Sequence, residues 1–209
     1  MFDNGRSIDL AFALVGAAPL PCDHGFSLFA AVSRVLPAAH EVNDLAIHPI
    51  RGRIIGDRRM QLCEWSKLTI RASAERIADL LPLAGKSLRL DGAALRIGVP
   101  EVRILIPSTA VRSRLVVIKV AHAGAADLTA ETFIAAARRQ MDELGIGTAA
   151  VFNVGKRRSL RLKQREIVGY ELLVEGLTAV ESIVLQERGL GGKRHMGCGV
   201  FVAFDEKAK

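Results

Sequence analysis

The feature that most constrains the fold of this chain is an order of predicted elements that occurs twice. Apolar periodicity and turn residues predict strand, helix, strand, strand, helix, strand in each half. In the first half these elements cover residues 8–16, 25–36, 45–55, 67–72, 73–81 and 87–97; in the second they cover 114–120, 129–144, 149–154, 160–175, 178–187 and 199–204. The sequence therefore predicts an α+β protein with two tandem ferredoxin-like (βαββαβ, RRM-like) domains, each an antiparallel sheet with two helices on one face.

The predicted domain boundary lies between residues 106 and 110, giving domains 1–107 and 108–209. The chain has 209 residues, enough for two domains of about 100 residues or for one larger domain. Half of its residues are hydrophobic, so a sizeable core is expected. The halves share element order without visible sequence identity, and a single α+β domain is the alternative.

The charge balance favours a polyanionic partner. Lysine and arginine number 29 against 22 acidic residues, and the net charge is +7. Cationic side chains that neutralise phosphates release condensed counterions, which drives binding to nucleic acids. Aromatic residues make up only 5% of the chain, so the sequence does not predict a surface on which many bases stack.

Cysteine usage indicates a reducing, cytoplasmic location. Cys22, Cys63 and Cys198 are far apart and form no CxxC pair. This pattern predicts neither a disulfide framework nor a zinc site, and no acidic cluster suggests another metal. The apolar run from Ala11 to Leu20 is too short to span a bilayer, so we expect a buried first strand and no membrane partner.

The strongest local motif is the glycine-rich loop at residues 189–199, between the last predicted helix and the last strand. A dinucleotide fingerprint needs glycine at position 194 and a phosphate-binding Walker loop needs serine or threonine there, but Arg194 occupies it. What remains is a loop whose backbone could approach a ligand closely, with Lys193, Arg194 and His195 at its tip. The alternative is a flexible glycine-rich hairpin without a ligand.

This loop resembles the C-terminal glycine-rich loop of the Cas6 family of CRISPR repeat-processing endoribonucleases. The resemblance rests on Gly189-Leu190-Gly191, five residues of basic character, and Gly197-Cys198-Gly199. Its place before the last strand of a second ferredoxin-like half also matches. The resemblance implies binding of CRISPR repeat RNA, as a hairpin or single strand, and one cut per repeat without metal or cofactor. Other CRISPR effector subunits are further expected partners.

Metal-independent RNA scission needs groups that move protons. The substrate's 2′-hydroxyl attacks the adjacent phosphate, a general base takes its proton, and a general acid protonates the leaving 5′ oxygen. Histidine suits both roles near neutral pH. The resemblance implies a catalytic histidine in or near the first helix, which His24 matches best; His48 and His40 are the runners-up. His195 is expected to contact phosphate instead.

Further basic residues are expected to hold the RNA. Alternation along one strand would place Arg161, Lys163 and Arg165 on one face as a basic stripe about 13 Å long, from a rise of about 3.3 Å per residue. A solvated strand face that discourages edge pairing is the alternative. The other predicted RNA-binding residues lie before this stripe, on the helix over 129–144 and on the glycine loop: Lys156, Arg157, Arg158, Arg138, Arg139, Gly189, Gly191, Lys193, Arg194, His195, Gly197 and Gly199.

Two rival functions share parts of this pattern. A non-catalytic RNA-binding subunit of a CRISPR guide-RNA complex would carry the same glycine loop but leave the repeat intact. An unrelated basic ferredoxin-like protein, such as a ribosome-associated or transfer-RNA-binding factor, would match the fold and charge without the full loop. The histidine near the first helix favours the enzyme.

Overall fold

The chain divides into two compact units, Met1–Ile104 and Leu105–Lys209, each of which is described by itself. The structure is a computed structural model that describes residues 6–40, 45–119, 128–147 and 149–205. The sequence predicted a boundary after residue 107. Each unit contains an antiparallel sheet with helices, as expected for an α+β fold. No helix within the described ranges is long and apolar enough to cross a membrane.

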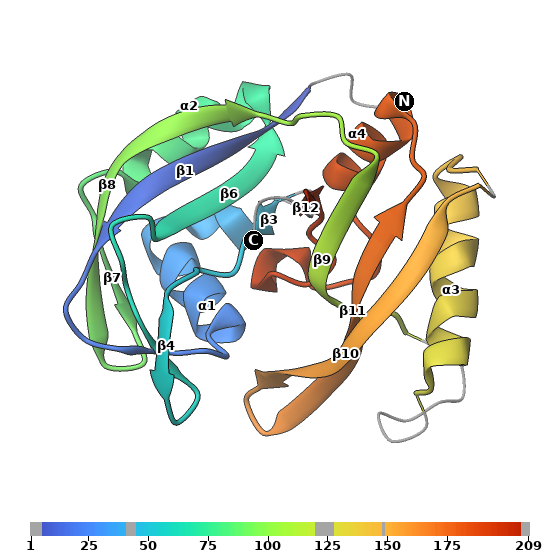
Figure 1. Ribbon diagram of the computed structural model, residues 1–209. Helices are drawn as coiled ribbons and strands as arrows, with labels where there is room; N and C mark the ends of the chain where they lie inside the picture. Colours follow the sequence, from blue (N-terminus) through green and yellow to red (C-terminus); the bar gives the residue numbers. More distant parts are fainter. Residues whose placement is uncertain (1–5, 41–44, 120–127, 148, 206–209) are drawn as a thin grey trace. The chain divides into compact units, whose positions relative to one another are not determined.

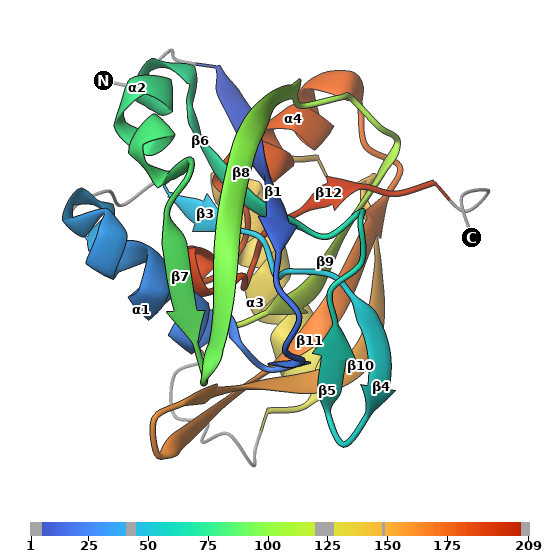
Figure 2. The same ribbon diagram turned by 90° about the vertical axis from the view of Figure 1, so that its left-hand side faces the viewer.

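The N-terminal unit is built on a five-stranded antiparallel sheet with the order β3-β6-β1-β8-β7 (Figures 1 and 2). Leu28, Phe29 and Val32 on one side of the first helix are buried, and this helix packs against β7. The strand order β3-β6-β1-β8 within this sheet is the one expected for the predicted βαββαβ arrangement. The elements of this layer are β1 (Ser7–Val15), α1 (Gly25–Val35), η1 (Pro37–His40), β3 (Ala46–Ile47), β6 (Lys67–Ser73), β7 (Ser87–Leu90) and β8 (Ala93–Ile104).

The second helix of this unit is much shorter than predicted. Its α-helical part, α2, spans only Ile77–Leu80, between the 3-10 turns η2 (Ala74–Arg76) and η3 (Leu81–Leu83). The shortening is at the N-terminal side, where Ser73 belongs to β6 and residues 74–76 form a 3-10 turn in place of the predicted α-helix. The second helix therefore covers little of the sheet.

The predicted strand over residues 45–55 is divided in two. Pro49 interrupts it, since proline cannot donate to a sheet ladder. The second part, β4 (Arg53–Gly56), joins β5 (Arg59–Gln61) and β2 (Leu20–Pro21) in a small separate sheet. Gly52 is required at its base, because a Cβ atom there would lie 2.5 Å from the Gln61 carbonyl oxygen.

The C-terminal unit has a four-stranded sheet with the ferredoxin-like order β10-β11-β9-β12. Phe133 and Leu185 from the two helices share one buried cluster with Val111, Leu172 and Val174 from the strands. Both helices begin within one residue of their predicted starts, and their N-caps Thr129 and Thr178 form capping boxes. The elements are β9 (Ala110–Val116), α3 (Ala130–Glu143), β10 (Val151–Leu162), β11 (Arg165–Glu175), α4 (Ala179–Arg188), η4 (Arg194–Met196) and β12 (Val202–Ala203).

The prediction of a basic stripe along one strand is wrong. Strand β10 ends at Leu162, which pairs with Arg165 at the start of β11, so residues 163 and 164 form a two-residue hairpin turn. Lys163 has a φ of +55°, in the left-handed region that such a turn requires. Arg161 and Arg165 therefore lie on two antiparallel strands. The physical cause is the Lys163-Gln164 turn, which lacks the glycine that usually marks a hairpin.

Candidate active site and nucleic-acid interface

His24, the first candidate for proton transfer, is held inside the N-terminal unit. It is the N-cap residue of α1 and is 2% exposed. Its Nε2 accepts a hydrogen bond from the Ile50 backbone N–H at 3.0 Å. The proton must therefore be on Nδ1, which lies 2.8 Å from the Pro21 carbonyl oxygen and donates to it. In this conformation both ring nitrogens bond to the chain's own backbone, a geometry that weighs against His24 as general acid or base.

His48, the residue directly after β3, belongs to a polar cluster with Asp9 of β1 and Arg71 of β6. Its Nε2 lies 3.4 Å from Asp9 Oδ1, and the side chains of His48 and Asp9 are only 14% and 15% exposed. Arg71, which is 2% exposed, binds both oxygens of Asp9 through its Nε and Nη2 at 2.7 and 2.9 Å. The register places Asp9 opposite Arg71, so the sheet itself aligns this pair.

The pKa values of Asp9 and His48 are both lowered in this cluster. Burial favours the protonated form of Asp9, but contacts with His48 and Arg71 outweigh it and hold the pKa of Asp9 well below its usual range. Burial also lowers the pKa of His48, and Asp9 opposes that shift only in part. His48 is therefore neutral near pH 7, with Nε2 facing a carboxylate that Arg71 already binds. Such a cluster stabilises the sheet.

His40, the third candidate, is the last residue of the 3-10 helix η1, directly after α1. Its side chain lies outside the described residues. Its place in the chain, a few residues beyond the first helix, satisfies the expectation that the catalytic histidine lies in or near that helix. His40 is thus the candidate that remains once the contacts of His24 and His48 are considered.

The glycine-rich loop folds back on its own unit. Its apolar residues Leu190 and Cys198 are buried, and Met196 is 9% exposed. The N–H groups of Gly192 and Gly199 donate to Val117 and Leu115 carbonyl oxygens at 3.0 and 2.7 Å, which fastens the loop to the end of β9. The loop is therefore an ordered part of the sheet layer.

Three of the loop glycines are needed for approach of the chain to itself. A Cβ atom at Gly189, Gly191 or Gly199 would lie about 2 Å from a backbone oxygen, at 2.2, 2.1 and 1.9 Å respectively, and all three have positive φ. Gly197 also has positive φ, whereas a Cβ at Gly192 would meet nothing within 4 Å. The sequence predicted close approach to a ligand, but these contacts explain the glycines by backbone packing.

The three basic residues at the tip of the loop differ in their exposure and contacts. Lys193 is exposed and has a left-handed conformation with φ of +66°. Arg194 is half-buried, and its Nη2 donates to the Glu187 carbonyl oxygen near the end of α4. His195 is also half-buried. Lys193 is therefore the loop cation most open to a phosphate.

A cationic surface lies on the face of the C-terminal sheet opposite its helices. Val111 faces the helices, so alternation places Arg112 and Arg114 of β9 on the other face. Arg112 and Arg158 both pair with Glu171, whose side chain is 10% exposed. Burial and the nearby guanidiniums of Arg114 and Arg112 lower the pKa of Arg158, as expected where positive charge is concentrated.

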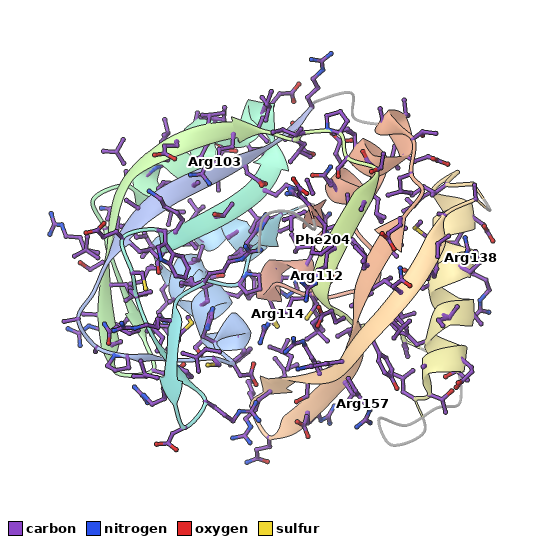
Figure 3. The ribbon with its side chains drawn as sticks, in the orientation of Figure 1. Arg103, Arg112, Arg114, Arg138, Arg157 and Phe204 are labelled. Atoms are coloured by element: carbon purple, nitrogen blue, oxygen red, sulfur yellow. The ribbon has the colours of Figure 1, made fainter. Side chains whose placement is uncertain are left out.

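Arg114 and Phe204 extend this surface, which we define as the open face: Arg112, Arg114, Arg158, Glu171 and Phe204. Arg114 is exposed, and the guanidinium carbon of Arg112 lies 5.5 Å from the centroid of the Phe204 ring (Figure 3). Three guanidiniums against one carboxylate suit a polyanion, and a ring with an arginine offers a platform for one base.

Comparison with known proteins places the chain in a family. The model of the family described as Cas6 Crispr matches residues 8–206. The chain belongs to the Cas6 family. A curated relative, the CRISPR-associated endonuclease Cas6 of Myxococcus xanthus (strain DK1622), is 38% identical over 195 residues, which cover 93% of this chain and 80% of the relative.

Solved structures of Cas6 proteins and their relatives share the fold. A structure described as a RAMP protein binding different RNA substrates has a TM-score of 0.71 at 14% identity, over 95% of this chain and 99% of that one. The CRISPR endoribonuclease Cse3 bound to a 19-nucleotide RNA has a TM-score of 0.52 at 15% identity, over 96% and 100%. The predicted fold class is confirmed, and so is the Cas6 resemblance.

The remaining residues that were predicted to bind RNA differ in their exposure. Arg138 packs over the Phe152 ring, with its guanidinium carbon 4.0 Å from the centroid, and donates to the Ala150 carbonyl oxygen, which is a structural role. Arg139 on the same helix is exposed. On the β10–β11 hairpin, Arg158 is half-buried and the exposed cations are Lys156, Arg157, Arg161, Lys163 and Arg165.

Sequence reasoning missed Arg112, Arg114 and Phe204. The alternation of Val111, Arg112, Ser113 and Arg114 was a signal that could have found the two arginines, but the predicted strand began at residue 114. Phe204 lies after β12 and gives no local sign of its neighbours. Among the described residues, no group of three or more His, Cys, Asp or Glu side chains is arranged to hold a metal ion.

Proposed function

We propose that this Cas6 family member binds CRISPR repeat transcripts and cleaves once within each repeat to yield guide RNAs. The observation that carries the proposal is the match of the Cas6 model to residues 8–206, together with 38% identity to a protein named as a CRISPR-associated endonuclease. The basic composition and the open face of the C-terminal sheet provide the surface that a polyanionic substrate requires.

The reaction uses the 2′-hydroxyl of the RNA as nucleophile. That oxygen attacks the adjacent phosphorus, the bond to the 5′ oxygen of the next nucleotide breaks, and the products carry a 2′,3′-cyclic phosphate and a 5′-hydroxyl. One group takes the proton of the attacking hydroxyl and another protonates the leaving oxygen. No metal or cofactor enters this scheme.

His40 is the residue to which we assign proton transfer, with His24 and His48 as alternatives. The support is the contrast among the three: His24 uses both ring nitrogens inside the fold, and His48 faces the Asp9–Arg71 pair. A general acid or base must reach the RNA with one nitrogen. His40 ends η1, close in sequence to the first helix.

RNA binding is assigned to the C-terminal unit. Exposed cations on the β10–β11 hairpin and on the open face would hold phosphates, and Phe204 would support one base. From the glycine loop, Lys193 would contact the backbone, with Arg194 and His195 beside it. Arg139 would add a contact from α3. Hairpin and single-stranded repeats both suit such contacts, because A-form stems are read mainly by shape.

The test of this function is single-turnover incubation with the host's own repeat RNA in excess EDTA. We expect one cut per repeat and products that end in cyclic phosphate and 5′-hydroxyl. The matched control is the same RNA with a single 2′-deoxy nucleotide at the cut position, which should bind equally and remain intact. Cleavage of the deoxy RNA, or cleavage that stops in EDTA, would contradict the proposed chemistry.

A non-catalytic RNA-binding subunit is the second candidate function. The contacts of His24 and His48 favour it, since both rings serve the fold. Tight binding of the repeat without cleavage would establish this role. In either role we place the protein in the cytoplasm, in agreement with three free cysteines, and expect other CRISPR effector subunits as partners.

A further inference from the structure

Residues 98–104 of β8 form an open edge of the N-terminal sheet. Strand β7 pairs only with the Ala93–Arg96 part of β8. The last backbone bonds on that side join Ile97 to Gly85 and Lys86. Beyond Ile97, β8 continues to Ile104 with β1 as its strand neighbour among the described residues, as Figure 2 shows. An edge of this length is a template for another strand.

The register shows which backbone groups point outward from this edge. The backbone carbonyl oxygen of Thr69 in β6 accepts a hydrogen bond from the backbone N–H of His48, the residue after β3. The backbone polar groups of Thr69 therefore face away from β1. Ala11, opposite Thr69, therefore bonds toward β8, where it lies opposite Glu101. Because the direction alternates, the backbone groups of Val102 and Ile104 point to the open edge.

The side chains along this edge include exposed apolar groups. Val102 and Ile104 are 56% and 76% exposed, although they lie opposite the buried Leu10 and Ile8 on the face that carries the helices. Helix α2 is only four residues long and leaves them uncovered. Pro100, two residues before Val102, has no N–H group to donate to a neighbouring strand. Proline is tolerated at the edge of a sheet and not in its middle, so Pro100 agrees with an edge position.

The charges of this edge complement those of the same edge in a second copy of the chain, if the two copies are related by a two-fold axis. If two copies of β8 pair antiparallel about Val102, Glu101 of each lies opposite Arg103 of the other. Both side chains are more than half exposed, and within one chain they already pair at 2.7 Å. The two apolar side chains of Val102 would meet at the axis, and the Ile104 N–H would meet the Pro100 carbonyl oxygen.

We propose that this edge is a homodimer interface, in which β8 of one chain pairs antiparallel with β8 of a second copy about Val102. Two backbone hydrogen bonds between the Val102 residues, two from Ile104 and two Glu101–Arg103 pairs would hold it. The partner is a second copy because the Glu101-Val102-Arg103 sequence complements itself in this register. Figure 3 labels Arg103, a residue of β8 whose side chain is 53% exposed.

Sedimentation equilibrium on the full chain tests the proposal through charge reversal. We expect a concentration-dependent dimer for the wild type. Glu101→Arg and Arg103→Glu should each weaken it about tenfold, because either change puts like charges opposite each other. An equimolar mixture of the two variants should dimerise about as well as wild type, since opposite charges then meet only between chains. Arg89→Glu, on the exposed face of β7, is the matched control and should have no effect.

The mixture separates this interface from an effect inside one chain. Loss of the internal Glu101–Arg103 pair would weaken both variants alike and mixing would not restore them. Circular dichroism and thermal melts check that each variant folds. A wild-type chain that stays monomeric at high micromolar concentration, a dimer indifferent to both reversals, or a mixture no stronger than its parts would each overturn the proposal.

Discussion

The two units of this Cas6 family member treat their charged groups in opposite ways. The N-terminal unit buries an Asp9–His48–Arg71 cluster and the His24 ring among its strands. The C-terminal unit carries cations on a hairpin and on the open face of its sheet, where Arg112 and Arg158 pair with Glu171. The difference teaches that histidines near the first helix are not equivalent candidates for chemistry, whereas many basic residues of the second unit are exposed at its surface.

The same contrast applies within the C-terminal unit. The glycine loop has the sharpest motif, yet three of its glycines serve contacts of the backbone with itself. The β10–β11 hairpin has no motif, yet it carries five exposed cations. A strong sequence pattern here marks a structural requirement, and a diffuse one marks a surface.

The largest expected effect concerns the glycines that the loop needs for packing of its backbone. Gly199→Ala should destabilise the C-terminal unit by about 4 kcal/mol, because its φ is +64° and the new Cβ would lie 1.9 Å from the Leu190 carbonyl oxygen. Gly192→Ala is the matched control, since nothing lies within 4 Å of its Cβ position, and it should change stability by less than about 0.5 kcal/mol. Urea unfolding measures both. Equal losses would show that the loop is not packed as described.

A second prediction addresses the buried cluster of the N-terminal unit. Asp9→Ala should cost about 3 kcal/mol, because it leaves the guanidinium of Arg71 buried without its carboxylate. Asp79→Ala removes an exposed partner of Arg76 and should cost at most about 0.5 kcal/mol. Urea midpoints compare the two. Similar values would mean that the Asp9 pair is solvated like a surface ion pair.

The exposed cations are tested by RNA affinity. Arg114→Ala should weaken repeat binding about fivefold and reduce the slope of log K against log salt by roughly 0.7 to 0.9, the value for one phosphate contact. Arg89→Ala, an exposed arginine on β7, is the control and should leave both quantities unchanged. Filter binding across a salt series measures them. An unchanged salt slope for Arg114→Ala would remove the open face from the RNA surface.

The smallest predicted effect is on pH dependence. Since burial lowers the pKa of His48, the unfolded chain binds more protons than the folded one below about pH 6.5, and stability should fall as pH falls from 7.5 to 5. Asp9 stays ionised in this window in both states and contributes only below about pH 4. His48→Gln should flatten the slope. A slope unchanged by this substitution would contradict the buried, neutral His48.

Much of the fold followed from local signals, and the errors have local causes. The helix starts at Thr129 and Thr178 were predicted to within one residue because a helix N-terminus depends on a few adjacent residues. The short α2 and the hairpin turn at Lys163 were missed. Residues 74–76 form a 3-10 turn where the apolar pattern predicted α-helix, and a turn without glycine looks like strand.

The candidate site was less predictable because it depends on tertiary contacts. Nothing local in the sequence indicates that Ile50 donates to His24 or that Asp9 faces His48 across strands. The pairing of Arg112 with Glu171 and its stacking on Phe204 likewise join distant segments. Residue type indicated the chemistry, and the contacts decided which histidines serve the fold.

The most direct test of the central claim compares His40→Ala with His24→Ala in single-turnover cleavage of the repeat RNA in EDTA, at saturating protein and with folding checked by thermal melts. We predict that His40→Ala lowers the cleavage rate by about 10²-fold or more with unchanged RNA affinity. Folded His24→Ala should retain a rate within a few fold of wild type. Full activity in His40→Ala, with loss confined to a folded His24→Ala protein, would contradict the account.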